Sequence, residues 1–144
     1  GIDQSRITVL PPAPAYRDHL GAYANVDIGL DTFPYHGTTT TCEALWMGVP
    51  VITLRGDRHA SRVGASLLSA VGLSDLVADT EQDFVRIARS LASNTERLRA
   101  WRTPGAPSLR EQMANSPLCD ARPFASRFQA AIRDAWRRWC TSGK

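Results

Sequence analysis

The residues that suggest chemistry lie in the stretch HGTTTTCEALWMGVP, which runs from His36 to Pro50. Its four threonines lead directly into a segment with the composition of a helix, although the branched threonine side chain crowds the preceding helical turn. Backbone N–H groups at a helix start carry partial positive charge and bind phosphate. We therefore expect this helix start to hold a diphosphate. The expected diphosphate contacts are Gly37, Thr38, Thr39 and Thr40.

Glu43 lies three residues after Thr40, on the same helical face and one turn deeper. From there its carboxylate can accept hydrogen bonds from ribose hydroxyls, as an acidic residue does in dinucleotide-binding folds. The alternative is that one threonine caps the helix and the others are ordinary surface residues. The sequence has neither a GxxxxGK[ST] nor a GxGxxG motif, which excludes P-loop chemistry and argues against NAD binding.

The elements that must position these groups alternate between strands and helices. Apolar runs predict strands at 6–10, 26–30, 49–54 and, at an edge, 73–77. Helices are expected at 16–24, 38–47 (ended by Gly48), 59–72 (ended by Gly72), after a capping box at Thr80 and Asp83, and at 123–140. We therefore expect an α/β fold with a Rossmann-like parallel sheet flanked by helices. Ligands bind such sheets at the carboxyl ends of the strands, where the threonine run falls.

Length and composition limit the classes of protein. The 144 residues are enough for one domain, and 43% apolar with 22% charged residues is typical of a globular protein. The net charge of +3 comes mostly from dispersed arginines, which gives little support to nucleic-acid binding. Three cysteines without metal spacing and the absence of a long apolar run suggest a reduced, cytoplasmic protein that does not enter a membrane.

The chain divides by pattern into an α/β part at about 1–78, which carries the phosphate-binding helix, and C-terminal helices at about 79–144. Pro104, Gly105 and Pro107 predict a break between two of these helices. The opening GIDQSRITVL has the pattern of the entry to an interior strand. We therefore expect a domain that is incomplete at its N-terminus.

The segments DIGLDTFPYHGTTTTCEALWMGVPVITLRG, ASRVGASLL, VGLSDLVA and SPLCD resemble the C-terminal catalytic region of the O-GlcNAc transferase and SPINDLY family, from about residue 6 to residue 140. The resemblance implies the C-terminal, donor-binding half of a GT-B glycosyltransferase, which has two Rossmann-like domains. It implies UDP-GlcNAc or GDP-fucose as the donor and Ser or Thr of a protein as the acceptor. It implies no cofactor and no metal ion, and the sequence has no DxD-like acidic pair near the phosphate loop.

The resemblance also implies roles for single residues. The threonines at 38–40 match those that hold the donor diphosphate, and Glu43 matches the acidic residue that binds ribose. His19 matches a histidine that stacks near the base, while Pro14 and Tyr16 border the base edge. Arg62 either faces the phosphate site or pairs on the surface. The sequence shows no obvious general base.

Other conspicuous side chains have structural interpretations. His36 is either a site residue or a turn residue, and His59 is either a site residue or a neighbour of a helix cap. Cys42 lies inside a predicted helix and is expected to be a small buried residue rather than a nucleophile. The large apolar residues expected in the core are Trp46, Met47, Phe84 and Phe128.

The acceptor-side domain and the helical repeats of the family have no counterpart in this sequence. We therefore expect the acceptor protein to bind those parts, and no turnover by the 144 residues alone. The rival hypothesis is a non-catalytic remnant or interaction module of the same fold. The last helix carries one apolar stripe, for which we expect self-association as the means of burial. The stripe consists of Phe124, Phe128, Ile132, Ala135 and Trp139.

Overall fold

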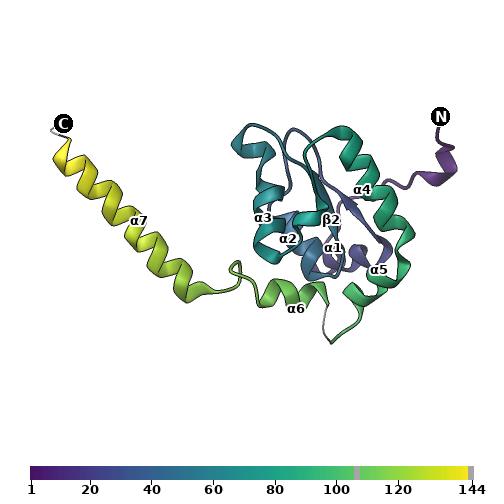
Figure 1. Ribbon diagram of the computed structural model, residues 1–144. Helices are drawn as coiled ribbons and strands as arrows, with labels where there is room; N and C mark the ends of the chain where they lie inside the picture. The colour runs from purple at the N-terminus through teal and green to yellow at the C-terminus, as the bar shows by residue number, and fades with distance from the viewer. Residues whose placement is uncertain (106–107, 143–144) are drawn as a thin grey trace.

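A small parallel sheet forms the centre of the computed structural model, which describes residues 1–105 and 108–142 (Figure 1). The strands are β1 (Gly29–Leu30), β2 (Val51–Leu54) and β3 (Val77–Ala78), in the order β1-β2-β3. Gly29 lies opposite Val51, and Thr53 lies opposite Val77. The Rossmann-like parallel arrangement predicted from the sequence is confirmed. However, β1 is shorter than predicted, and most of the edge strand predicted at 73–77 was wrong, because Ser74–Leu76 form a 3-10 turn and β3 begins only at Val77.

Helices cover both faces of this sheet. The helices α2 (Thr39–Trp46) and α3 (Val63–Val71) lie on one face, and α4 (Glu81–Ser93) lies on the other (Figure 1). The central strand β2 is buried over its first three residues, as its unbroken apolar sequence predicts. Gly48 and Gly72 follow α2 and α3 with φ of 81° and 85°, so both predicted stop signals are confirmed.

The other elements are short, apart from the last helix. They are α1 (Tyr16–Ala22), α5 (Thr95–Arg102), α6 (Leu109–Ala114), α7 (Ala121–Thr141) and the 3-10 turns η1 (Gln4–Arg6), η2 (Tyr23–Asn25), η3 (His59–Ser61) and η4 (Ser74–Leu76). The predicted helix at 59–72 is divided into η3 and α3. The predicted break after α5 is confirmed, although Pro107 lies outside the described residues. Thr80 Oγ1 accepts from the Asp83 N–H at 3.1 Å, which confirms the predicted cap of α4.

The hydrophobic core lies between the sheet and its helices. Its main cluster consists of Leu45, Ile52, Leu68, Val71, Leu73, Leu76, Leu91, Trp101, Leu109 and Met113, and Phe84 packs against it.

The prediction that Trp46 lies in the core was wrong. Its ring is 39% exposed on the outside of α2, where the Arg110 guanidinium lies 5.2 Å from the ring centroid. Arg110 also donates to the Trp46 carbonyl at 2.9 Å, so this face of α2 is covered by a cation rather than by apolar side chains.

The prediction of a buried strand at 6–10 was wrong. The chain forms η1 at Gln4–Arg6 and then continues without strand pairing. The side chains of Ile7, Val9 and Leu10 are 57%, 87% and 60% exposed. A strand is stabilised by its cross-strand neighbours, so β-branched residues alone do not form one.

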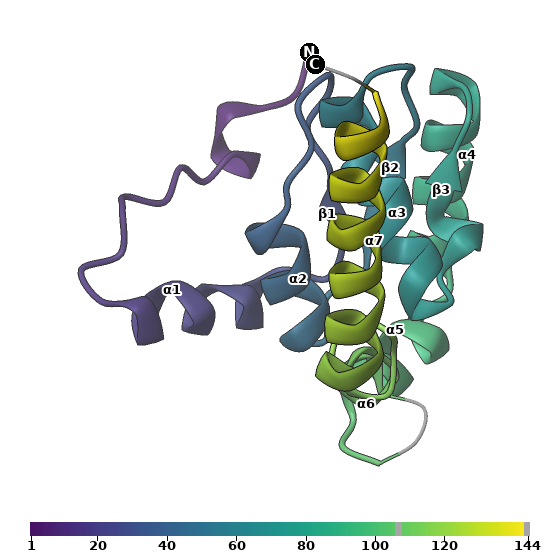
Figure 2. The same ribbon diagram turned by 90° about the vertical axis from the view of Figure 1, so that its left-hand side faces the viewer.

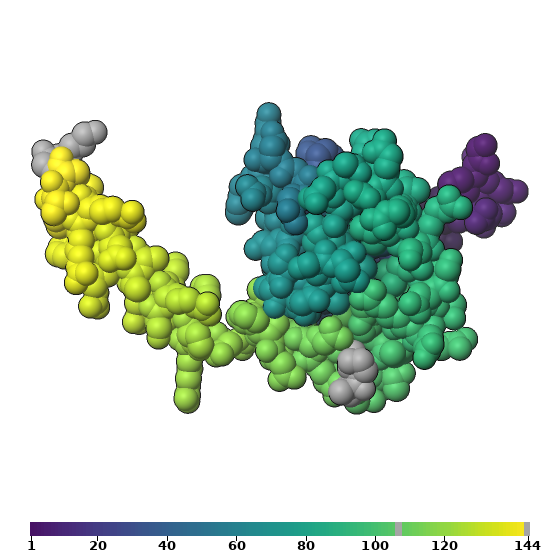
Figure 3. Space-filling model, viewed as in Figure 1, coloured from purple at the N-terminus to yellow at the C-terminus, as the bar shows by residue number. Residues whose placement is uncertain are grey.

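The last helix, α7, projects away from the α/β body (Figure 1) and lies in front of that body when the molecule is turned by 90° (Figure 2). The space-filling view shows it joined to the body by a thin connection (Figure 3). No residue of α7 is buried, so the prediction that Phe128 lies in the core was also wrong. In residues 1–105 and 108–142, no helix combines the length and the apolar character needed to cross a membrane.

Candidate functional site

The start of α2 follows the loop that leaves the carboxyl end of β1. Thr38 is its N-cap residue, yet the Thr38 side chain makes no capping hydrogen bond. In contrast, Thr80, Asn94 and Ser108 each accept a hydrogen bond from the first turn of the helix that they precede. The alternative in which a threonine caps this helix therefore finds no support at its N-cap.

The N–H groups and exposed hydroxyls of this first turn make no hydrogen bonds to other described residues of the protein. In the described part of the chain, the N–H groups from Thr38 to Thr41 have no hydrogen-bond acceptor. The hydroxyls of the three exposed threonines, at 38–40, likewise make no hydrogen bond within residues 1–105 and 108–142. Four N–H donors and three hydroxyls thus surround one helix start, an arrangement suited to an anion.

Gly37 lets the backbone approach this turn closely. A Cβ on Gly37 would lie 2.6 Å from Thr40 Oγ1 and 2.8 Å from Thr41 Oγ1, so a larger residue would displace the turn. A cavity of about 190 Å³ opens beside it, between β1 and α2, with Asp31 and both threonines in its wall. The side chains expected here from the sequence were the threonines at 38–40, and the structure adds the buried Thr41 to this wall.

Glu43 is joined to α1 by two hydrogen bonds. Its Oε1 accepts from the Tyr16 hydroxyl at 3.0 Å, and its Oε2 lies 3.0 Å from His19 Nε2. The Glu43 side chain is only 11% exposed and that of His19 is 43% exposed. The hydrogen bond to the carboxylate raises the pKa of the Tyr16 hydroxyl above its usual value. The structure therefore brings together three of the predicted site residues, from two different helices.

Tyr23 connects this cluster to the start of α2 and was missed by sequence reasoning. Its ring meets the His19 ring edge-on at a centroid distance of 5.6 Å, and its hydroxyl donates to the Thr40 carbonyl at 3.3 Å. Burial, followed by the nearby Glu43 charge, raises the pKa of the Tyr23 hydroxyl. The spacing of four residues from His19 was the available signal, because it places the two rings on one helical face.

A largely apolar cavity of about 450 Å³ lies on the other side of these rings. It is lined by Leu10, Pro11, Pro12, Ala13, His19, Ala22, Tyr23 and Val26. Flat aromatic rings and prolines suit a nucleobase, which has apolar faces. Pro14 is exposed in the turn before α1 and does not line this cavity, so its contact with the base edge stays a prediction.

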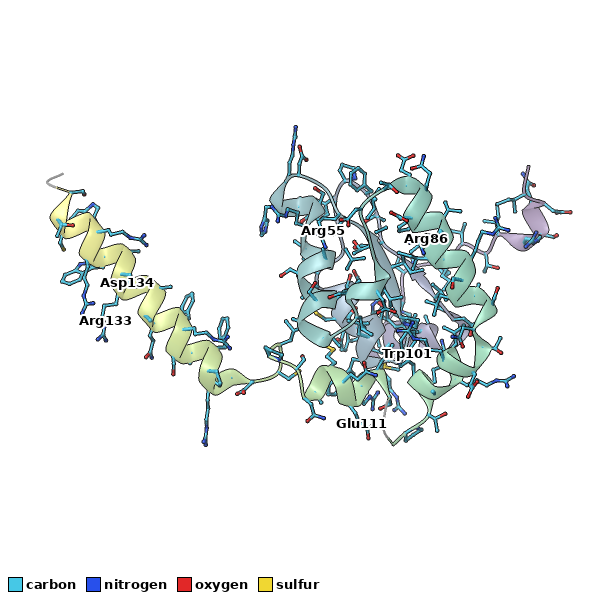
Figure 4. The ribbon with its side chains drawn as sticks, viewed as in Figure 1. Arg55, Arg86, Trp101, Glu111, Arg133 and Asp134 are labelled. Atoms are coloured by element: carbon cyan, nitrogen blue, oxygen red, sulfur yellow. The ribbon has the colours of Figure 1, made fainter. Side chains whose placement is uncertain are left out.

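Arg62 lies in a different place. It lines a groove of about 650 Å³ beside the start of α3, together with Arg55, Asp57 and His59. Figure 4 shows Arg55 beside α3 at this end of the molecule. The lining of this groove does not include the first turn of α2, so a phosphate contact of Arg62 also stays a prediction.

His36 and Cys42 differ in their surroundings. His36 is only 1% exposed beneath the loop that precedes α2, where its ring makes hydrogen bonds to the end of β2 and the start of α3, so it is not a simple turn residue. Cys42 is partly buried, and this burial raises the pKa of its thiol above the usual value. A thiol that stays protonated is a poor nucleophile, as expected for a packing residue.

The family model of glycosyl transferase family 41 matches residues 1–128 of this chain. The probable UDP-N-acetylglucosamine–peptide N-acetylglucosaminyltransferase SPINDLY of Eustoma exaltatum subsp. russellianum is 50% identical over 140 residues, which are 97% of this chain and 15% of that protein. The UDP-N-acetylglucosamine–peptide N-acetylglucosaminyltransferase of Caenorhabditis elegans is 32% identical over 139 residues, which are 96% of this chain and 12% of that protein. The chain thus spans a small part of the length of these relatives.

A solved structure shows the same fold. A mutant of the O-GlcNAc transferase of Thermobaculum terrenum superposes with a TM-score of 0.69 at 38% identity, over 94% of this chain and 25% of that one. The sequence match covers the threonine run, the Glu43 helix and the sheet that positions them. This chain belongs to glycosyl transferase family 41.

Proposed function

We propose that this chain is the nucleotide-sugar-binding part of a protein O-glycosyltransferase. The observation that carries the proposal is the first turn of α2, where four N–H groups and three hydroxyls have no partner in the described residues. Family membership supports the reaction class. The curated relatives are named as transferases from UDP-N-acetylglucosamine to peptides, which favours that donor. GDP-fucose is the other donor that the family resemblance implies.

In this proposal the donor lies along the edge formed by α1 and α2. Its diphosphate meets the first turn of α2, its ribose meets Glu43, and its base enters the apolar cavity beside His19. The Glu43 oxygens each accept one hydrogen bond from the protein, and a carboxylate has about four acceptor positions, so both can also accept from ribose. Tyr16 and Tyr23 keep the base and ribose ends of the site in fixed relation to the phosphate end.

The proposed chemistry is stabilisation of the leaving diphosphate. As a Ser or Thr hydroxyl of the acceptor attacks the anomeric carbon, the bond from that carbon to the diphosphate oxygen breaks, and negative charge grows on the diphosphate. The hydroxyl proton is released to water or to the leaving diphosphate. Fixed N–H and hydroxyl donors at the start of α2 stabilise that charge without a metal ion or another cofactor. The acceptor protein is proposed to bind outside these 144 residues, because they correspond to only 15% of a relative that is named as acting on peptides. The proposed location of the reaction is the cytoplasm.

Calorimetric titration with UDP, GDP, uridine and guanosine tests the proposal. We expect one diphosphate to bind at least about tenfold more tightly than its nucleoside, a difference of about 1.4 kcal/mol, and to bind equally well with EDTA. Thr39→Val should weaken the binding of the diphosphate, because it removes one hydroxyl at constant volume. Thr95→Val, on the exposed start of α5, should leave that binding unchanged. Equal affinity for diphosphate and nucleoside, or no binding of either, would overturn the proposal and favour a non-catalytic interaction module.

A further inference from the structure

His36 joins the phosphate loop to two other parts of the fold. Its backbone N–H donates to the Ala60 carbonyl at 3.0 Å. Its Nε2 lies 3.0 Å from the Leu54 carbonyl, and its Nδ1 lies 3.1 Å from the Gly64 N–H. Because a carbonyl only accepts and an N–H only donates, Nε2 carries the proton and Nδ1 is the acceptor. The ring thus ties the loop to the end of β2 and to the start of α3.

Asp31 completes a buried cluster around this ring. Its Oδ1 accepts from the Gly37 N–H at 2.9 Å, and its Oδ2 accepts from the Thr53 hydroxyl at 2.8 Å. The Thr53 oxygen lies 3.2 Å from His36 Nδ1. The side chains of His36 and Asp31 are 0% and 4% exposed. Gly37 directly precedes the turn of α2 whose N–H groups have no partner. Its own N–H is therefore held by the Asp31 carboxylate, which lies beside the His36 ring.

Gly64 packs closely against this cluster. A Cβ on Gly64 would lie 2.4 Å from Asp31 Oδ2, 2.5 Å from Thr53 Oγ1 and 3.0 Å from His36 Nδ1. Gly37 has no side chain with which to fix the turn that follows it. The direction of the N–H groups at 38–41 therefore depends on the restraint from Asp31 and His36.

We propose that His36 is a positioning residue for the diphosphate site, an inference that rests on the proposed function. The buried ring does not touch the donor; it fixes the backbone of the loop, so that the donors of α2 point to one place before the ligand arrives. Preorganised donors bind an anion without the cost of ordering a mobile loop. Loss of the ring should therefore weaken the binding of the diphosphate, while the base and ribose contacts at His19 and Glu43 stay unchanged.

Two substitutions separate this role from a general role in folding. His36→Leu removes the acceptor for the Gly64 N–H. His36→Asn offers an oxygen near the position of Nδ1 and retains this acceptor. We expect His36→Leu to lose about tenfold in UDP affinity, the order expected for lost hydrogen bonds, with an unchanged affinity for uridine. His36→Asn should retain most of the UDP affinity.

The outcomes distinguish this inference from the proposed function. If wild type does not prefer UDP, or GDP, over the nucleoside, the proposed function fails and the inference fails with it. Suppose that wild type prefers the nucleoside diphosphate over the nucleoside. If His36→Leu then shows the same preference, or loses affinity for nucleoside and diphosphate equally, the inference alone is overturned. Should His36→Leu not fold, Thr53→Val carries the same test, because it removes the hydroxyl between Asp31 and His36 at constant volume. A selective loss of diphosphate affinity is again expected, and an unselective loss or none contradicts the inference.

Discussion

Glu43 Oε2 lies 3.0 Å from His19 Nε2, across 24 residues of sequence. The residue expected to bind ribose and the residue expected to stack near the base are therefore in direct contact. This contact holds α1 against α2. It also gives Glu43 a structural role in addition to the ribose contact expected from the sequence.

Glu43→Ala is predicted to weaken UDP or GDP binding by about 1–3 kcal/mol, as is typical for loss of a hydrogen bond to a charged group. Its melting temperature should also fall, because the substitution leaves Tyr16 and His19 without their shared acceptor. Calorimetry and thermal unfolding measure the two effects, and Glu81→Ala on the exposed start of α4 is the control. A variant that melts early but binds nucleotide like wild type would show that Glu43 is only structural.

The two raised tyrosine pKa values predict a loss of stability at alkaline pH. The pKa of Tyr16 and the pKa of Tyr23 are both raised in the folded protein above the ordinary value of 10.0. Their contribution to the free energy of unfolding is therefore complete below the ordinary pKa and is lost as pH rises through the folded value. Urea unfolding from about pH 8 to about pH 11 should show this loss.

Tyr16→Phe should reduce the alkaline loss, because the variant has no hydroxyl to ionise beside Glu43. Tyr35→Phe is the control, since that ring is 75% exposed. If wild type and Tyr16→Phe show the same alkaline dependence, the hydrogen bond from Tyr16 to Glu43 does not form in solution.

Two helical glycines should respond in opposite ways to alanine. Gly21→Ala in α1 is predicted to stabilise the protein by up to about 1 kcal/mol, because nothing lies within 4 Å of the position that its Cβ would take and alanine favours a helix. Gly64→Ala in α3 is predicted to destabilise it by about 1–3 kcal/mol, because its Cβ would enter the cluster of Asp31, Thr53 and His36. Urea unfolding measures both, and stabilisation by both substitutions would show that the cluster is not packed as described.

The fold was predictable where local sequence determines it. The apolar run of β2, the stop at Gly48 and the cap at Thr80 need only their neighbours. The burial of His36 was not predictable, because its partner Gly64 lies 28 residues away and its own neighbours, an exposed Tyr35 and Gly37, resemble a turn.

The wrong predictions also come from contacts between residues that are distant in sequence. Trp46 has the apolar character of a core residue but lies on the face of α2 that Arg110 covers, a contact 64 residues away in sequence. In the site, the threonine run and Glu43 were visible because their spacing follows one helix. The link from Tyr23 to that helix depends on how α1 packs against α2, and the link from Thr53 to Asp31 depends on the pairing of β1 with β2, which no local pattern specifies.

The exposed stripe of α7 is predicted to mediate self-association. Its large side chains are between 55% and 63% exposed, and an apolar patch of several hundred Å² is usually buried by association. The large side chains of the stripe are Phe124, Phe128, Ile132 and Trp139, and Trp136 lies just beside it with a similar exposure. Sedimentation velocity over a range of concentrations should show dimers or larger species. Ile132→Glu should shift them to monomer, and Arg133→Glu, at a position labelled on α7 in Figure 4, is the control. A wild-type monomer at the highest concentration would contradict this prediction.

The measurement that tests the central claim most directly is the change in NMR amide shifts at the first turn of α2 on adding UDP or GDP. The N–H groups from Thr38 to Thr41 have no acceptor in the described structure, whereas the Gly37 N–H is bonded to Asp31. We predict large shifts for the four threonine amides with a nucleoside diphosphate, a smaller shift for Gly37, and much smaller shifts throughout with the matching nucleoside. Equal shifts with diphosphate and nucleoside, or none with either, would contradict a diphosphate site at the start of α2.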